Sequence, residues 1–359
     1  MKVLYDHQMF SMQKYGGITR YFSDLIFDLP LGYEGELPIL YSENHYLREK
    51  EDVVIRKFSD ILPFRLKRLY YYHRNTILSN QAIKKNEFNL FHPTYYDPYF
   101  IKKIKKPFVI TVHDMNHEKF PDLFLAYDNT SENKRLLAKE AAHIIAVSQN
   151  TKKDLVELFG ISPDKITVVY HGYKQHCKSA EALFENYLLF VGERKGYKNF
   201  WNFIKAMVPL LNKYKDLKII CTGNPFSREE LEQLNQIKLI DRVIQKSVSD
   251  SELASLYRYA LAFVYPSIYE GFGIPILEAF QNDCPVCLSK ASCFPEIAEN
   301  AAVYFDPSDL DSITEAVRKV LENKSLADDL RDAGRIRLKD FSIDLMVKNT
   351  CEVYNKYAF

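Results

Sequence analysis

The chain has 359 residues, of which 47% are hydrophobic and 26% charged, with 12 glycines. This length is too great for one ordinary core and fits two domains of about 150–180 residues, while the composition excludes long disordered tails. A formal net charge of +1 excludes the strongly basic character typical of nucleic-acid-binding proteins, so no nucleic-acid partner is expected.

Cysteine usage and hydropathy indicate a cytoplasmic chain. We find neither a secretion signal at the N-terminus nor an apolar run of about 18 residues that could span a membrane. Cys284 and Cys287 form a close pair, but a zinc site of this type needs a second pair of ligands, so no metal is expected. Free thiols, mostly buried in apolar runs, are expected at Cys177, Cys221, Cys284, Cys287, Cys293 and Cys351.

Short apolar runs alternate with longer amphipathic segments, which predicts parallel strands joined by crossover helices. In the first half, a strand at residues 2–7 leads through a glycine pair into a helix over residues 18–29. A later helix is expected to be capped near Asn150 or Thr151, and Ser148 is interpreted as a structural cap. The other strands of this half are predicted at residues 89–93, 108–114, 143–149 and 167–172.

The same alternation restarts after a polar stretch at residues 174–186, which is therefore the predicted domain boundary. The strands of the second half are predicted at residues 187–193, 217–224, 241–245, 261–267, 284–289 and 301–305. The pattern predicts two doubly wound α/β domains, at residues 1–175 and 176–340, with a ligand in the cleft between them.

Helix signals in the second half are local and specific. Ser249 followed three residues later by Glu252 predicts a capping box. From Asp311 onward the chain is predicted to be helical nearly to its end, with breaks at Gly334 and around Phe341.

The most informative segment is YPSIYEGFGIPILEAF at residues 265–280, where a strand is predicted to run through a glycine-rich loop into a helix. Glycines let the backbone approach a ligand closely, and the free amides of a helix N-terminus bind phosphate. Glu270 and Glu278 flank this anion site. Because a carboxylate repels a diphosphate, we expect Glu270 to bind sugar hydroxyls and Glu278 to bind ribose hydroxyls.

These residues resemble a known motif. Glu270 and Glu278, within Pro-Ser-x-x-Glu-Gly-Phe-Gly-x-Pro-x-x-Glu-Ala, are similar to the paired glutamates of the family-four retaining glycosyltransferases. VGERKGYKNF at residues 191–200 is similar to the donor-phosphate motif of that family, with Arg194 and Lys198 as its cations. The resemblance implies donor contacts at Gly192, Arg194, Lys198, Gly223, Val248, Glu270, Gly271, Phe272, Gly273, Ile274 and Glu278.

The first half carries weaker parts of the same resemblance. Gly16 and Gly17 resemble the loop that closes over the donor phosphates, and His113 resembles the histidine beside the transferred sugar. Asp114 is a less specific candidate, and His171 is expected in the hinge between the domains. Glycine pairs are frequent in ordinary turns and a histidine at a strand end often only packs, so these positions also have a purely structural interpretation.

The resemblance implies the GT-B fold, two Rossmann-like domains with the helix at residues 341–359 packing back on the first. It implies a retaining, metal-independent transfer without a cofactor, in which His113, Arg194, Lys198 and Glu270 are the catalytic residues. The substrates would be a GDP- or UDP-linked sugar and a glycan or lipid-linked acceptor. Residues 91–98 and 111–121 look most similar to bacterial mannosyltransferases of O-antigen and exopolysaccharide assembly. A sugar-nucleotide epimerase and an inactive scaffold subunit are the alternatives.

A basic segment stands out at residues 53–106, which hold twelve Lys or Arg and three Asp or Glu, a local balance of +9. Within it, residues 61–78 interleave aliphatic and aromatic side chains with basic ones, as interfacial helices do on anionic lipid. One interpretation of this pattern is a peripheral position on the inner face of the cytoplasmic membrane. The pattern is equally typical of an ordinary amphipathic helix with its aromatic residues in the core, and both interpretations stay open.

Overall fold

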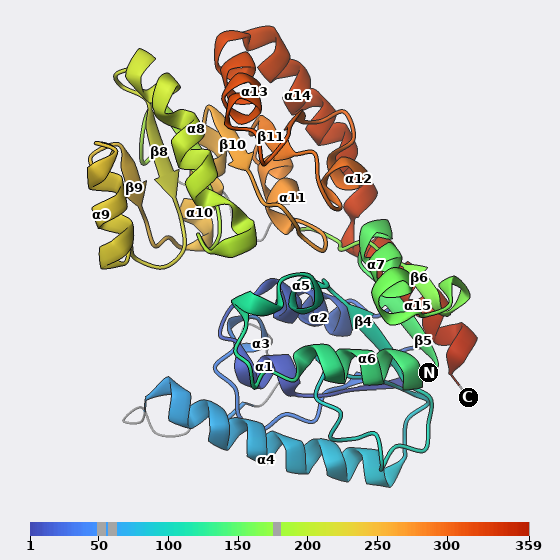
Figure 1. Cartoon of the computed structure of the whole chain (residues 1–359). Helices are drawn as coiled ribbons and strands as arrows, with labels where there is room; N and C mark the ends of the chain where they lie inside the picture. Colours follow the sequence, from blue (N-terminus) through green and yellow to red (C-terminus); the bar gives the residue numbers. More distant parts are fainter. Residues whose placement is uncertain (49–54, 57–62, 175–180, 359) are drawn as a thin grey trace. The chain divides into compact units, whose positions relative to one another are not determined.

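The computed structural model describes residues 1–48, 55–56, 63–174 and 181–358 (Figure 1). The chain divides into two compact units, and each is described by itself. The first comprises Met1–Gly172 together with Ile343–Phe359, and the second comprises Tyr173–Ser342. The boundary predicted at residue 175 and the thiol of Cys177 lie outside the described residues.

The second unit contains a sheet of six parallel strands, each within a segment predicted from the sequence. They are β7 (Tyr187–Phe190), β8 (Lys218–Cys221), β9 (Val243–Gln245), β10 (Ala262–Tyr265), β11 (Val286–Ser289) and β12 (Val303–Phe305). Their order is β12-β11-β10-β7-β8-β9. The chain therefore leaves β7 in one direction for β8 and β9 and returns to its other side at β10. This reversal is the topological switch point at which doubly wound sheets bind ligands.

The helices of this unit cover the sheet and bury an apolar core. On one side, Phe203 and Met207 pack in a buried cluster with Ile313 and Val317. The predicted capping box of Ser249 and Glu252 is confirmed. The helices are α8 (Phe200–Lys213), α9 (Arg228–Gln236), α10 (Asp250–Tyr259), α11 (Ile274–Gln281), α12 (Phe294–Ala298), α13 (Leu310–Glu322) and α14 (Lys324–Arg337).

The predicted helix break at Gly334 is wrong, because this glycine lies inside α14. A methyl group added at Gly334 would lie 2.7 Å from the ring atom Cδ1 of buried Phe280. Glycine is thus needed for the close approach of α14 to α11. The break lies instead at Asn323, whose side chain accepts a hydrogen bond from the backbone N–H of Leu326 and caps α14. A short 3₁₀ turn at Leu338–Phe341 ends the helical run, as predicted.

Gly334→Ala should destabilise the second unit, although the same change at an exposed helical site stabilises by about 1 kcal/mol. Overpacking in a full core costs about 1–3 kcal/mol, so the net loss should be about 1 kcal/mol, measured by urea denaturation. Gly17→Ala is the matched control, since a methyl group there meets no atom within 4 Å. A gain in stability for Gly334→Ala would contradict the packing argument.

The first unit has two three-stranded parallel sheets, in the orders β2-β1-β3 and β4-β5-β6. An isolated parallel bridge between Phe91 and Phe108 joins them. The strands are β1 (Lys2–Tyr5), β2 (Glu34–Glu36), β3 (Leu90–His92), β4 (Val109–Val112), β5 (His143–Ala146) and β6 (Ile166–Val168). β2 is a short, polar strand that was not predicted, and the strand predicted at residues 167–172 ends at Val168.

Two helix assignments in this unit need correction. A short helix, α1, which the sequence analysis missed, lies between β1 and the glycine pair. Ser148 is the N-cap of α7, and its side chain accepts a hydrogen bond from the backbone N–H of Thr151. The predicted structural role of Ser148 is therefore confirmed, and the cap predicted near Asn150 or Thr151 is wrong. The helices are α1 (Gln8–Met12), α2 (Gly17–Phe27), α3 (His45–Arg48), α4 (Phe64–Lys85), α5 (Asn116–Lys119), α6 (Thr130–Glu140), α7 (Gln149–Phe159) and α15 (Ile343–Tyr357).

The C-terminal helix α15 completes the core of the first unit, as predicted. Its Met346 and Tyr354 lie in the buried cluster that contains Tyr5 and Phe22. The Tyr354 hydroxyl also bonds to the ring Nδ1 of buried His92 at 2.6 Å. The last residues of the chain therefore stabilise the strands that begin it.

Two further expectations concern thiols and the membrane. The described cysteines are free and buried, as predicted. Among the described helices, none combines the length and the apolar character needed to cross a membrane.

Candidate active site

The predicted motifs of the second unit meet at one edge of its sheet. β7 and β10 pair directly, with Leu188 beside Ala262, and parallel strands place their carboxyl ends at the same edge. The turn after β7 carries Gly192, Arg194 and Lys198, and the turn after β10 carries residues 270–273. The site thus lies at the switch point of the sheet.

Three of the predicted glycines are needed for the backbone conformation of these turns. Gly192, Gly223 and Gly273 have φ values of 122°, 100° and 97°, which other residues rarely adopt. A side chain at Gly223 would also lie 2.8 Å from the carbonyl oxygen of Gly192, so the turns after β7 and β8 approach closely. Gly273 is the N-cap of α11, so Ile274 opens that helix.

Lys198 and Glu270 form an ion pair across the switch point. The Lys198 Nζ donates to Glu270 Oε1 at 2.7 Å and lies 5.6 Å from the centre of the Tyr265 ring. Glu270 is only 8% exposed. The carboxylate is thus held in place next to the start of α11, with its lysine supplied by the neighbouring strand.

Hydrogen bonds from the buried thiol of Cys293 hold the loop after β10 in place. The thiol donates to the backbone carbonyls of Glu270 at 3.2 Å and Phe272 at 3.1 Å. The ring of Phe272 in turn packs edge-on against Phe341. Ser267 lies in the same loop, fully buried, and its hydroxyl has no hydrogen-bond partner among the described residues. Sequence analysis predicted Cys293 only as a buried free thiol and assigned no role to Ser267, although Ser267 belongs to the quoted motif.

Arg194 has a carboxylate partner that the sequence analysis did not find. Its Nε and one terminal nitrogen donate to the two oxygens of Glu230 at 2.8 and 3.0 Å, and the guanidinium lies 4.6 Å from the Phe226 ring. Burial raises the pKa of Glu230, but hydrogen bonds from Arg194 and Ser227 outweigh it and hold that pKa below its usual value. The spacing of Ser227 and Glu230, a capping box at the start of α9, was the available signal.

Glu278 lies in α11 and is half-buried. Its Oε2 accepts a hydrogen bond from the hydroxyl of Tyr257 at 2.9 Å. Burial, followed by the nearby Glu278 charge, raises the pKa of Tyr257 well above its usual value, so this tyrosine stays a donor. Val248 is half-buried in the loop between β9 and α10.

In the first unit, His113 directly follows β4 and is 8% exposed. Neither of its ring nitrogens has a hydrogen-bond partner among the described residues. Burial lowers its pKa to about 3, so the imidazole is neutral at physiological pH. His171 stacks on it at 5.5 Å, and Tyr21 meets it edge-on at 5.2 Å. His171, expected in a hinge, is thus also a direct neighbour of His113.

The glycine pair and Asp114 have clear local roles. Gly16 caps α2 in an extended conformation, and a side chain there would collide with Gln13. Gly17 opens α2, the helix that carries Tyr21. Asp114 accepts a hydrogen bond from the backbone N–H of Asn116 at 3.0 Å and so shapes the turn after His113.

Glycine-rich turns at the switch point of a parallel sheet are the signature of a nucleotide-binding, Rossmann-like unit, and here a second parallel α/β unit accompanies it. Comparison with protein families identifies the family within this class. Residues 15–174 match the family model "Glycosyltransferase Family 4" and residues 174–337 match "Glycosyl transferases group 1". The chain belongs to the glycosyltransferases that these two models describe.

Two of the chain's relatives are named as O-antigen mannosyltransferases. The chain is 32% identical over 212 residues to the O-antigen chain mannosyltransferase RfbU of Salmonella typhimurium. This match covers 59% of this chain and 60% of RfbU. The chain is 27% identical over 298 residues to the O-antigen chain mannosyltransferase B of Escherichia coli, which covers 76% of each. The match thus spans less than two thirds of RfbU.

Solved structures confirm the fold. Anabaena HepE, determined with UDP and glucose, has a TM-score of 0.76 at 16% identity and covers 99% of both chains. A glycosyltransferase of Rickettsia africae has a TM-score of 0.73 at 18% identity, covering 99% of this chain and 98% of that one. The predicted GT-B fold is therefore correct.

Arg194→Ala should lower the free energy of unfolding of the second unit by about 3 kcal/mol, because it leaves the Glu230 carboxylate without its cation. The double variant Arg194→Ala with Glu230→Ala should recover much of this loss. Chemical denaturation measures both. Arg228→Ala, which breaks an exposed pair with Glu232, is the matched control and should change little. Unchanged stability of Arg194→Ala together with lost turnover would show that Arg194 serves the donor rather than the fold.

Proposed function

We propose that the chain transfers a hexose, most simply mannose from GDP-mannose, to a growing cell-surface glycan such as O-antigen, lipopolysaccharide or capsule, with retention of anomeric configuration. The observation that carries the proposal is the Lys198–Glu270 pair, 2.7 Å long, beside the N-terminus of α11. It combines a cation for phosphate with a carboxylate for sugar hydroxyls. The choice of mannose is supported by the names of RfbU and mannosyltransferase B.

In this proposal the leaving diphosphate is stabilised by positive charge. As the bond between the anomeric carbon and the phosphate oxygen breaks, negative charge grows on the diphosphate, and Lys198 and the free amides of α11 lie where it can be received. Arg194 contributes only if its guanidinium exchanges Glu230 for phosphate. Glu270 orients the sugar through its hydroxyls, and Glu278 binds the ribose.

The acceptor hydroxyl attacks the anomeric carbon from the face that the phosphate leaves. Its oxygen forms the new bond, its proton passes to the departing phosphate oxygen, and no protein base is required. In this proposal neutral His113 binds the transferred sugar, because its ring nitrogens have no partner among the described residues and can accept or donate a hydrogen bond. The reaction needs neither a metal nor a cofactor.

A UDP-linked sugar is the alternative donor, favoured by the UDP and glucose bound in HepE. We place the enzyme in the cytoplasm, with its acceptor at the membrane surface.

The test is an assay of GDP-mannose, UDP-glucose, UDP-galactose and UDP-N-acetylglucosamine with a panel of mannose-containing acceptors in excess chelator. Transfer from GDP-mannose, with an α-linked product by NMR, is the expected result. Loss of turnover in chelator with rescue by manganese would contradict metal independence. Conversion of a donor to a sugar isomer without acceptor would identify an epimerase instead.

Lys198→Ala should lower kcat by about two to three decades, because its contact with the diphosphate strengthens as the bond breaks. Glu278→Ala should mainly raise the donor KM, because a ribose contact is equal before and during reaction. Steady-state kinetics with varied donor separates the two. Lys195→Ala, at an exposed lysine three residues away, is the matched control. An intact kcat in Lys198→Ala would remove this lysine from the leaving-group site.

Membrane recruitment is the second part of the proposal. Helix α4 runs along the outside of the first unit (Figure 1) and exposes Leu66, Leu69 and Ile77, spaced so that they share one side. Lys67, first counted among the basic residues, is instead buried in an ion pair with Glu43 at 3.2 Å. Lys57, Asp60 and the side chain of Arg65 lie outside the described residues.

Arg74→Gln with Lys84→Gln should weaken binding to vesicles that contain anionic lipid, since both side chains are exposed on α4. Raised salt should weaken the wild type similarly by screening. Vesicle co-sedimentation measures both effects. Lys205→Gln with Lys215→Gln, exposed in the second unit, is the matched control. If the wild type ignores anionic vesicles at low salt, the basic segment is only a solvated surface.

A further inference from the structure

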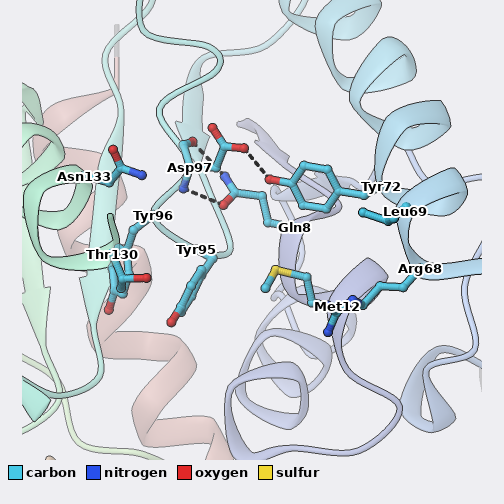
Figure 2. Close-up of a pocket in the computed structure, with 10 residues that line it drawn as sticks. All are labelled: Gln8, Met12, Arg68, Leu69, Tyr72, Tyr95, Tyr96, Asp97, Thr130 and Asn133. Atoms are coloured by element: carbon cyan, nitrogen blue, oxygen red, sulfur yellow. Dashed lines mark hydrogen bonds between the residues drawn. The ribbon is translucent and has the colours of Figure 1, made fainter. Parts of the chain in front are cut away.

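The first unit contains a pocket of about 290 Å³ at the carboxyl ends of β1 and β3. Figure 2 shows its walls: Gln8 from α1, Tyr72 from α4, Tyr95 and Asp97 from the loop after β3, and Asn133 from α6. In the order β2-β1-β3, the chain leaves β1 on one side and returns on the other. The pocket therefore lies at the switch point of this sheet, where a ligand is expected.

One wall of the pocket is a rigid polar network. The backbone N–H of Asp97 donates to Gln8 Oε1 at 2.8 Å, and Gln8 Nε2 donates to the Asp97 carbonyl at 3.1 Å. Gln8 is fully buried and also donates to Asp6. The Tyr72 hydroxyl donates to Asp97 Oδ2 at 2.5 Å. The Asp97 carboxylate is thus held at the pocket as a fixed acceptor before any ligand arrives.

Another wall of the pocket is formed by the aromatic side chains of Tyr95 and Tyr96. The ring of Tyr95 packs at 4.5 Å on that of Tyr96, and Tyr95 stays half-buried at the pocket. Figure 2 shows its ring opposite Met12 and Arg68. Aromatic faces bind the C–H face of a sugar ring, while carboxylate and amide groups pair with its hydroxyls.

Charge and size narrow the ligand class. Asp97 and Arg68 are the charged residues among those lining the pocket, and they offset each other. A diphosphate, which needs an excess of cations, is therefore disfavoured. The volume is just under the range of about 300–1,000 Å³ of whole-ligand pockets, so it suits one ring of a longer molecule.

The pocket is connected to the predicted catalytic histidine. The hydroxyl of Tyr96, which lines the pocket, accepts a hydrogen bond from the backbone N–H of His113 at 3.2 Å. We propose that this pocket is a subsite for an uncharged sugar unit of the acceptor glycan, beyond the hydroxyl that reacts. The proposal rests on the proposed function, because it assumes an acceptor that is a glycan.

Direct binding tests the pocket without turnover. The methyl glycosides of α-mannose, glucose, galactose and N-acetylglucosamine are titrated singly and followed by saturation-transfer NMR. At least one should bind the wild type, and Tyr95→Ala should weaken it about tenfold through loss of the ring face. Tyr259→Ala, at a half-exposed tyrosine in α10, is the matched control and should bind as the wild type does.

Kinetics give a second readout. With a competent acceptor, Tyr95→Ala should raise the acceptor KM about tenfold and leave the donor KM unchanged. Asn133→Ala is the second variant, used if thermal unfolding shows that Tyr95→Ala does not fold. The proposal is overturned if no glycoside binds the wild type, or if Tyr95→Ala weakens the nucleotide sugar instead. If no nucleotide sugar is turned over at all, the proposed function fails, while glycoside binding still decides the pocket.

Discussion

The direct pairing of β7 with β10 is the constraint on which the site of the second unit depends. Parallel strands that are neighbours in the sheet but distant in sequence bring the turn with Lys198 beside the turn with Glu270. Each of these turns contains a backbone conformation that glycine adopts easily, at Gly192 in the first and at Gly273 in the second. Cys293 then holds the second turn through two carbonyl groups. Geometry at the site is thus set by the sheet and its glycines before any side chain meets a ligand.

The two cations of the site both have carboxylate partners within 3 Å, Glu230 for Arg194 and Glu270 for Lys198. A diphosphate that binds here does not meet free positive charge, so it has to replace a carboxylate or share its cation. The two pairs differ in what such an exchange costs. Arg194 is held by a fork of two hydrogen bonds and by the Phe226 ring, whereas Lys198 has one bond to a partner that sugar hydroxyls can also engage. If a donor diphosphate binds here as proposed, Lys198 is the cation that it recruits at the lower free-energy cost.

Local patterns in the sequence predicted what depends on local physics. Apolar runs placed the strands of the second unit, and the spacing of Ser249 and Glu252 predicted the cap of α10. Pairings between distant positions could not be predicted in this way. Glu230 is 36 residues from Arg194, and Gln8 is 89 residues from Asp97, so only the folded topology shows that they meet. Gly334 was misread for the same reason, because its neighbour Phe280 belongs to another helix.

His113 is a buried histidine at the end of β4. Both ring nitrogens of His113 lack a hydrogen-bond partner within the described part of the chain, and each buried unsatisfied group costs about 1–3 kcal/mol. His92, a buried histidine of the neighbouring strand, has both nitrogens bonded, to Tyr354 and Thr111. The fold can thus satisfy a buried histidine at this depth, and the described residues do not do so for His113. His113 thus combines a neutral imidazole that no described residue satisfies with a backbone hydrogen bond to Tyr96, which lines the proposed sugar subsite. These are the properties of a group whose partner is a ligand.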